Sequence, residues 1–445
     1  MKQTILQRLE AKDFKGIREQ INTLNSANIA EILEQLNENY LLIVFRLLTK
    51  DQAVETFSYL STQTQEKLIS MITDTEIKYL VDELFFDDVI DLLEEMPANI
   101  VKKILSQVKD EQRPLINQFL KYPENSAGSL MTIEYVDLKR HYTVNDALVD
   151  IKQNGLSKET VYTCYVIDGN RKLEGIVSLR ELVTSDSHVK LEEIMNSDIV
   201  YVHTHDDQEE VALLFKKYDF IALPVVDNEG RLVGIITVDD IMDVIDEETT
   251  EDMYKMAAIA PTETTYLHSS STELAKNRII WLLFLMISAT FTGYIIKSYE
   301  DALEQAVILA SFIPMLMDTA GNAGSQASTM IIRGLALNEI KTKDLPKIIF
   351  KEFKVSIMVG AILSIVNFFR IFLFDQQATV GVALTVSLAL YMTVLIAKLV
   401  GAILPIVASK LKFDPAIMAS PLITTIADAL SLIIFFRLAV MILGI

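Results

Sequence analysis

The sequence predicts a multi-domain membrane protein with an all-α N-terminal domain, an α/β tandem repeat, a connecting helix and a five-helix transmembrane domain. Three observations lead to this fold class. From Lys276 onward the chain consists mainly of apolar segments that are long enough to cross a bilayer. Two half-similar units occupy the middle of the chain. Leucine-rich amphipathic units precede them and indicate a helical superhelix.

Charge divides the 445-residue chain into two parts. The formal net charge is −20. The chain from Lys276 onward has 14 basic and 10 acidic residues, whereas residues 1–275 have 26 basic and 50 acidic residues. Such an acidic part attracts cations and repels nucleic acid, so no nucleic-acid partner is expected. The N-terminus lacks the apolar run of a signal peptide, which predicts that this part stays in the cytosol. Cys164 is the only cysteine and excludes an intrachain disulfide.

The predicted domains follow one another in order. Residues 1–123 form the helical domain, 124–250 the tandem repeat, 251–275 the acidic connecting helix and 276–445 the membrane domain. Within the helical domain, Asp88 belongs to a local acidic surface with Asp87, Asp91, Glu94 and Glu95. Such a surface is either a solvated helix face or part of a metal site.

The repeat is visible in residues 161–183 and 220–242. Each unit has a strand, a polar turn, a second strand that begins at a glycine, and a helix. The pair resembles tandem CBS domains, whose nucleotide signature is G-h-h-[ST]-x-x-D. The second unit matches this signature with Thr237 and Asp240, whereas the first has Ser178 but replaces the aspartate with Glu181. The resemblance implies ATP or another adenine nucleotide as a ligand, although many such pairs bind nothing.

Carboxylates gather in the residues that join the repeat to the membrane domain. Spacings of three and four place several of them on one helix face, where like charges destabilise the helix. Divalent cations with oxygen ligands would offset this repulsion. The candidate metal ligands are Asp240, Asp243, Glu247, Glu251 and Asp252. The alternative is a solvated acidic helix.

Five spans are predicted, at 279–296, 306–337, 348–373, 380–408 and 416–443. Basic residues precede the first span and gather between the second and third and between the fourth and fifth. Because positive loops stay inside, the N-terminus is expected in the cytoplasm and the C-terminus outside the cell.

Polar side chains interrupt two of these spans. In the segment Pro314–Gln326, a proline and two glycines accompany Asp318, Asn322 and Gln326, which predicts a broken helix that lines a cation path. The alternative is a tightly packed helix with small residues at a helix interface. In the last span, Asp428 lies at membrane depth, where a carboxylate is normally functional, with Thr424 nearby. All-oxygen surroundings favour a hard cation such as Mg²⁺.

The order of domains, P-x-x-x-D-T-A-G-N-A-G-S-Q at 314–326 and P-L-I-T-T-I-A-D at 421–428 resemble the MgtE-type magnesium channels and transporters. The resemblance covers nearly the whole chain. It implies a homodimer in the cell membrane with one pore on the two-fold axis, lined by spans two and five. Asp428 would be the main selectivity carboxylate, with Thr424 in the same ring. The connecting helix would be a plug that closes the pore when cytosolic Mg²⁺ binds the acidic surfaces.

Three function classes stay open at this point. The first is a magnesium channel, and the second is a proton- or sodium-coupled exporter of divalent cations on the same scaffold. The third is a membrane-bound sensor that transports nothing. Lys398 is the only basic group at the depth of the two membrane acids, and it either pairs with one of them or extends to the interface. No phosphate-binding loop of the Walker type is present, and nothing indicates an enzyme.

Overall fold

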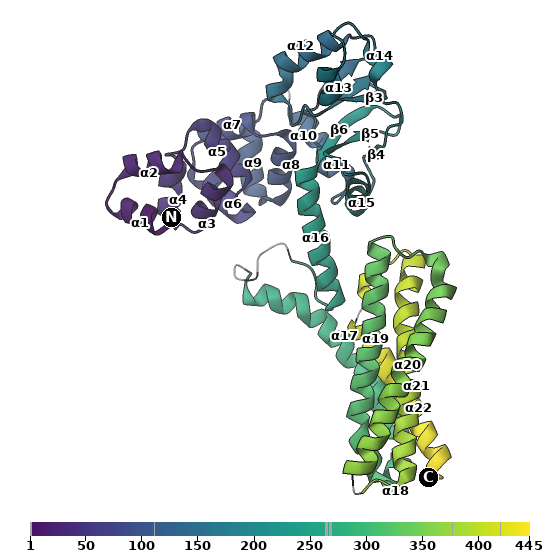
Figure 1. Ribbon diagram of the computed structural model, residues 1–445. Coiled ribbons are helices and arrows are strands. Elements are labelled where there is room, and N and C mark those ends of the chain that lie inside the picture. The colour runs from purple at the N-terminus through teal and green to yellow at the C-terminus, as the bar shows by residue number, and fades with distance from the viewer. Residues whose placement is uncertain (1, 111, 263–265, 267–268, 376, 419) are drawn as a thin grey trace. The chain divides into compact units, whose positions relative to one another are not determined.

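The computed structural model describes residues 2–110, 112–262, 266, 269–375, 377–418 and 420–445 (Figure 1). The chain divides into two compact units, Met1–Ile245 and Asp246–Ile445, and each unit is described by itself. The first unit contains short helices and two small sheets, and the second contains the long apolar helices. This arrangement confirms the predicted multi-domain class.

Short helices make up the first part of unit one. Polar residues begin several of them by capping: the side chains of Asn25, Asn37 and Thr49 each accept a hydrogen bond from a backbone N–H in the following turn. Buried isoleucine and leucine side chains, among them Ile17 and Leu33, pack into one core that extends along these helices. The helices are α1 (Lys2–Glu10), α2 (Phe14–Ile21), α3 (Ser26–Glu34), α4 (Glu38–Phe45), α5 (Lys50–Ser58), α6 (Thr62–Met71), α7 (Asp74–Glu83), α8 (Phe86–Glu95), α9 (Ala98–Gln107) and α10 (Arg113–Phe119).

Two sheets of the same topology follow. In each sheet the first strand pairs parallel with the second, and the second pairs antiparallel with the third. The first repeat comprises α11 (Ala127–Leu130), β1 (Asp137–Lys139), α12 (Val144–Asn154), η1 (Gly155–Ser157), β2 (Thr163–Ile167), β3 (Leu173–Ser178) and α13 (Leu179–Thr184). The second comprises α14 (Leu191–Ile194), β4 (Val202–His203), α15 (Gln208–Tyr218), β5 (Ala222–Val226), β6 (Leu232–Thr237) and α16 (Val238–Met256). The predicted repeat is therefore confirmed.

The two repeats exchange their opening segments. A Cβ on Gly234 of β6 would lie 2.7 Å from the Sδ atom of Met131, which opens the first repeat. A Cβ on Gly175 of β3 would lie 2.6 Å from the Sδ atom of Met195, which opens the second. Each glycine is thus needed because a methionine from the other repeat occupies the space of its side chain. The exchange makes the pair one structural unit.

The connecting helix differs from its prediction. A helix over 251–275 is expected, but α16 begins at Val238 and ends at Met256, and the next helix begins at Ser271. Ala258 adopts a left-handed φ of 55°, and the N–H of Ile259 donates to the carbonyl of Tyr254, which closes the helix in a Schellman motif. Pro261 follows. Residues 263–265 and 267–268 of the expected helix lie outside the described residues.

Among the described residues, five helical segments are long and apolar enough to cross a membrane, as predicted. They are Ser271–Ser298, Val307–Ala336, Thr342–Phe374, Val380–Lys410 and Pro415–Leu443. Their regular helices are α17 (Ser271–Ser298), α19 (Ile313–Ala336), α20 (Leu345–Phe374), α21 (Val380–Lys410) and α22 (Ser420–Leu443), with short α18 (Glu300–Gln305), η2 (Val307–Phe312), η3 (Thr342–Asp344) and η4 (Pro415–Met418) between them. In Figure 1 these long helices run alongside one another.

The predicted break in the second span is wrong. Helix α19 is continuous. Pro314 lies in its first turn, where a backbone N–H would have no acceptor within the helix, so its missing N–H breaks no helical hydrogen bond. Gly324 allows the backbones to approach, because a Cβ there would lie 2.7 Å from Cγ2 of Ile423 on α22 and 3.2 Å from the carbonyl oxygen of Ala397 on α21. The glycines therefore serve helix packing, which is the alternative that the sequence left open.

The contact between α19 and α21 leads to a stability prediction. A Cβ on Gly401 would meet the carbonyl group of Gly324, so Gly401→Ala is expected to destabilise the membrane domain by about 1–3 kcal/mol through overpacking. Gly293→Ala on α17 is the matched control, because no atom lies within 4 Å of the added methyl group. Thermal unfolding of both variants in detergent measures the difference. Equal stability of the two variants would contradict the close approach of α19 and α21.

Candidate functional site

A stripe of polar side chains runs along α19. Asp318, Asn322 and Gln326 are spaced by four residues in one continuous helix, so they lie on one face. All three are exposed in the single chain. The Asn322 side chain donates from Nδ2 to Oδ2 of Asp318 at 3.2 Å. A lipid-facing surface does not tolerate such a stripe, so a water-filled path or another protein surface is needed there.

Helix α22 places Asp428 near this stripe. Pro421 lies in the first turn of α22 and does not interrupt the helix. Thr424 packs on Gly321 of α19, whose added Cβ would lie 2.8 Å from the threonine Cγ2 atom. The carboxylates of Asp318 and Asp428 are near enough to repel each other. Oδ1 of Asp428 is buried, and in the described part of the chain it accepts no hydrogen bond.

Lys398 does not neutralise these two acids. It is buried on α21 with a relative exposure of 5%, and the described residues contain no ion pair that involves it. Pairing of Lys398 with Asp318 or Asp428, one of the two options from the sequence, is therefore not observed within one chain. Within the described part of one chain, neither carboxylate therefore has a basic side chain as its partner.

A second group of carboxylates lies in unit one, at the beginning of α16. Asp88 on α8 interacts electrostatically with Asp239 and Asp240 of α16 and with Glu134. Glu159, which follows η1, interacts with the same groups. We call this set the acidic cluster, and it consists of Asp87, Asp88, Asp91, Glu134, Glu159, Asp239 and Asp240.

Burial and mutual repulsion make the cluster hard to ionise. Burial, followed by the charges of Asp240 and Asp239, raises the pKa of Asp88 to about 6. Burial and the charges of Asp239 and Asp240 raise the pKa of Glu159 to about 8. The pKa of Asp240 rises to about 6, mainly through burial, although a hydrogen bond from Thr237 opposes the rise. A bound cation would favour ionisation of every member.

The donors of the cluster fit a hard cation only in part. They are all carboxylate oxygens, and Oε2 of Glu159 is buried without a hydrogen bond among the described groups. However, no three acidic, histidine or cysteine side chains of the described residues converge closely enough to enclose a metal ion. A magnesium ion that keeps several water molecules and uses one or two carboxylates is compatible with this spacing.

The raised pKa values predict how stability depends on pH. Because the folded cluster binds protons at higher pH than the unfolded chain, the free energy of opening α8 should fall as the pH rises from about 5 to about 8 in metal-free buffer. Hydrogen exchange of the α8 amides in the full-length protein, corrected for the intrinsic exchange rate at each pH, measures this free energy of opening. Glu159→Gln should reduce this pH dependence. Stability of α8 that increases with pH would contradict the clustering of these groups.

The remaining predicted metal ligands lie in unit two or along α16. Asp243 adds its charge to the field at Asp240, whereas Glu247 lies one turn further along α16. Glu251 and Asp252 lie near Asp414, which precedes η4. Burial and the charge of Asp414 raise the pKa of Asp252 to about 6. The structure thus distributes the predicted metal ligands of α16 along the helix, with Asp240 near its beginning and Glu251 and Asp252 near its end.

The nucleotide-signature residues have structural roles in this fold. Ser178 and Glu181 form a capping box at α13, in which the Ser178 hydroxyl accepts from the N–H of Glu181 and the Glu181 carboxylate accepts from the N–H of Ser178. Thr237 donates from Oγ1 to Oδ2 of Asp240 at 2.7 Å, which begins α16 in a similar way. Glu181 therefore fulfils the same local role as the aspartate of the second repeat.

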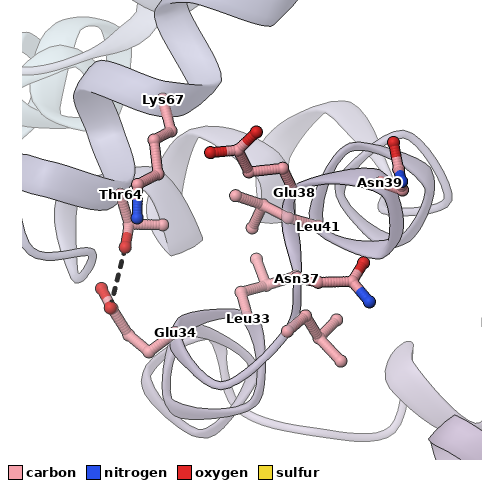
Figure 2. Close-up of a pocket in the computed structure, with 9 residues that line it drawn as sticks. Leu33, Glu34, Asn37, Glu38, Asn39, Leu41, Thr64 and Lys67 are labelled. Carbon is pink, nitrogen blue, oxygen red and sulfur yellow. Dashed lines mark hydrogen bonds between the residues drawn. The ribbon is translucent and has the colours of Figure 1, made fainter.

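A groove elsewhere in unit one contains none of the predicted residues. It has a volume of about 400 Å³ and lies among α3, α4 and α6. Figure 2 shows that the Thr64 hydroxyl donates a hydrogen bond to the Glu34 carboxylate across this groove. Glu34 also accepts from the N–H of Ser61 at 2.7 Å. Its carboxylate is thus used to cap α6, and we assign the groove no binding function.

Comparisons with known proteins identify relatives of each part of the chain. The family described as divalent cation transporter matches residues 313–438, which include both membrane acids. The MgtE intracellular N domain matches 24–125, and the CBS domain matches 127–188 and 191–247. The magnesium transporter MgtE of Thermus thermophilus is 34% identical over 435 residues, which are 97% of this chain and 96% of that protein. The chain belongs to the MgtE family of magnesium transporters.

Further relatives support the assignment. The MgtE of Bacillus subtilis is 34% identical and covers 96% of this chain and 93% of its own length. The cytosolic domain of an Mg²⁺ channel MgtE in complex with ATP has a TM-score of 0.52 and 35% identity, and the match covers 55% of this chain and all of that structure. The soluble part of a magnesium transporter has a TM-score of 0.52 and 30% identity, and the match covers 56% of this chain and 97% of that structure. Like the members of this family, the chain is a multi-pass membrane protein and not an enzyme.

The sequence alone does not identify every residue of the two candidate sites. Glu134 and Glu159 lie outside the helices, and no spacing links them to α8 or α16. Asp87 and Asp91 were visible as neighbours of Asp88, but helical spacing alone does not say which of them face α16. Charge density in the sequence finds such a cluster only where its members are close along the chain.

Proposed function

We propose that this protein is a magnesium channel that imports Mg²⁺ across the cell membrane and closes when cytosolic Mg²⁺ is plentiful. The observation that carries the proposal is the pair Asp318 and Asp428, with one buried carboxylate oxygen that has no hydrogen bond within the described chain. A mostly hydrated Mg²⁺ ion suits one or two such carboxylates. Thr424, Asn322 and Gln326 would add neutral oxygen atoms along the path.

The conduction path is proposed to lie between two copies of the chain. The stripe of Asp318, Asn322 and Gln326 is exposed in one copy, and a second copy related by two-fold symmetry would enclose it around an aqueous pore. Asp428 would then meet its symmetry mate, and the two negative charges would select a divalent cation. The basic loops support an orientation in which the N-terminus would lie in the cytoplasm and the C-terminus outside the cell.

The gate is proposed to be the acidic cluster together with α16. Without a cation, repulsion among Asp88, Glu159 and Asp240 favours separation of α8 from the beginning of α16. Mg²⁺ would bind the assembled cluster better than the separated one, so it would shift the population towards the closed state. Asp243, Glu247, Glu251 and Asp252 would extend the negative field along α16.

Nucleotide binding at the CBS pair is a further part of the proposal. It is supported by the relative that was crystallised with ATP and by the paired hydroxyl and carboxylate of Thr237 and Asp240. Binding would have to replace the Thr237–Asp240 hydrogen bond, and Ser178 is held in a capping box in the first repeat. Calorimetric titration of ATP into wild type and Thr237→Val tests this point.

Transport into liposomes tests the function directly. Mg²⁺ uptake through a channel needs only the Mg²⁺ gradient, and it should continue when an ionophore dissipates the proton and sodium gradients. Uptake should fall when the N-terminal face is exposed to millimolar Mg²⁺. Transport that stops without a proton or sodium gradient would instead favour the coupled exporter, and no transport in any condition would favour a sensor.

A further inference from the structure

Helix α16 carries eight carboxylates and one basic side chain, Lys255 in its last turn. The Nζ atom of Lys255 lies 2.7 Å from Oε1 of Glu251, one turn earlier in the same helix. It also lies 2.7 Å from Oδ2 of Asp414, which precedes the last membrane helix. The first contact is an ordinary helical pair, but the second joins distant parts of the chain. Lys255 therefore makes a tertiary contact.

Asp414 uses its two oxygen atoms for two different purposes. Oδ1 accepts the backbone N–H of Ala416 at 2.8 Å and so caps the turn η4. Oδ2 forms the ion pair with Nζ of Lys255. Because η4 leads into α22, the lysine holds the carboxylate that fixes the entry to the helix bearing Thr424 and Asp428.

Apolar and backbone contacts meet at the same end of α16. Met256 packs against Ile332 of α19 and Ala416 of η4. After the helix, the N–H of Ala260 donates to the carbonyl of Asn277 on α17 at 3.0 Å. The C-terminal end of α16 is thereby docked against segments that begin or end three of the apolar helices.

The docked end is unfavourable without a cation. The charges of Asp414, Glu248 and Glu251 all act on Asp252, so four carboxylates come together there. Within the described chain, Lys255 is the only partner of Glu251 and of Asp414 in any ion pair. The side chains of Lys255 and Asp414 are only 23% and 30% exposed, so solvent weakens their attraction less than at an open surface.

We propose that Lys255 is a positioning residue, a built-in cation that ties the C-terminal end of α16 to Asp414 and so holds it docked at the entry to α22. The proposal rests on the proposed function in one respect, because it assumes that docking of α16 reduces flux. Lys255 then supplies at this end of α16 the positive charge that Mg²⁺ supplies at the acidic cluster. Without the lysine, closure needs more Mg²⁺.

The test uses full-length protein in liposomes, with two readouts. Docking is measured as the rate at which a bifunctional maleimide joins cysteines introduced by Met256→Cys and Ile332→Cys, in a chain that carries Cys164→Ala. Gating is measured, without these cysteines, as the Mg²⁺ concentration that halves the flux. The variants are Lys255→Met, Lys255→Arg, Asp414→Asn, and Lys255→Met combined with Asp414→Asn.

Lys255→Met should lower the rate of cross-linking and raise the half-inhibitory Mg²⁺ concentration by at least about fivefold, the lower end of typical couplings between sites. Lys255→Arg should have the cross-linking rate and the half-inhibitory Mg²⁺ concentration of wild type, because it keeps the positive charge. The double variant should be no worse than Lys255→Met alone, because both changes remove the same contact.

The two readouts separate the proposal from the proposed function. If cross-linking is the same in Lys255→Met and wild type while Mg²⁺ still inhibits wild type, the positioning role is wrong and the gate stands. If Lys255→Met and Lys255→Arg are equally impaired, charge is not the cause and the proposal is also overturned. If Lys255→Met slows cross-linking but wild-type flux ignores Mg²⁺, the lysine contact is upheld and the proposed gate is wrong.

Discussion

Asp428→Asn is expected to reduce Mg²⁺ flux to the level of empty liposomes. The substitution keeps the size of the side chain but removes the negative charge whose buried oxygen lacks a hydrogen bond in the described chain. In a two-fold pore the loss is doubled, because both copies carry the change. Flux of Mg²⁺ into liposomes, measured with an internal magnesium-sensitive dye, gives the result.

Glu304→Gln is the matched control for this charge change. Glu304 lies exposed on α18, outside the long apolar helices, and the structure gives it no hydrogen bond or ion pair among the described residues. The control should conduct like wild type. Asp318→Asn should reduce flux less than Asp428→Asn, since Asp318 already accepts a hydrogen bond from Asn322. Normal flux through Asp428→Asn would remove this residue from the conduction path.

Removing charge from the acidic cluster is expected to keep the channel open. In the double variant Asp88→Asn with Glu159→Gln, repulsion falls, but so does the attraction for Mg²⁺, and the second effect decides the response to the ion. The Mg²⁺ concentration that halves the flux should rise by at least about tenfold, within the range of coupling between distinct sites. The dependence of flux on Mg²⁺ at the N-terminal face measures this.

Glu31→Gln provides the control for the cluster. Glu31 is an exposed residue of α3, and its substitution changes the net charge of unit one without touching the cluster. It should leave the half-inhibitory concentration unchanged. A double variant that responds to Mg²⁺ as wild type does would show that the regulatory ion binds elsewhere.

Features that depend on local sequence could be predicted. The five spans each follow from a single segment, because apolar length is a local property, and the repeat follows from two stretches of similar pattern. The position of Asp428 within the last span is local in the same sense, whereas its role in conduction stays a prediction. The break in α19 was a wrong prediction because the glycines there make room for other helices. Only the three-dimensional packing of Gly324 against α21 and α22 reveals this.

Features that depend on distant residues could not be predicted. Glu159 lies near Asp240 because the repeat folds its loop against the beginning of α16, and no pattern in the sequence encodes this contact. The end of α16 was also missed, since Ala258 adopts a left-handed conformation that sequence patterns assign to glycine. The pairing of Lys255 with Asp414 has the same origin.

Electrical recording from membrane patches with the N-terminal face accessible tests the central claim most directly. With a chelator on that face, wild-type protein should carry a Mg²⁺ current, and millimolar Mg²⁺ on the same face should suppress it. The Asp88→Asn, Glu159→Gln variant should carry the current in both conditions. A wild-type current that is the same with and without Mg²⁺ on that face would contradict the account of the acidic cluster as the gate.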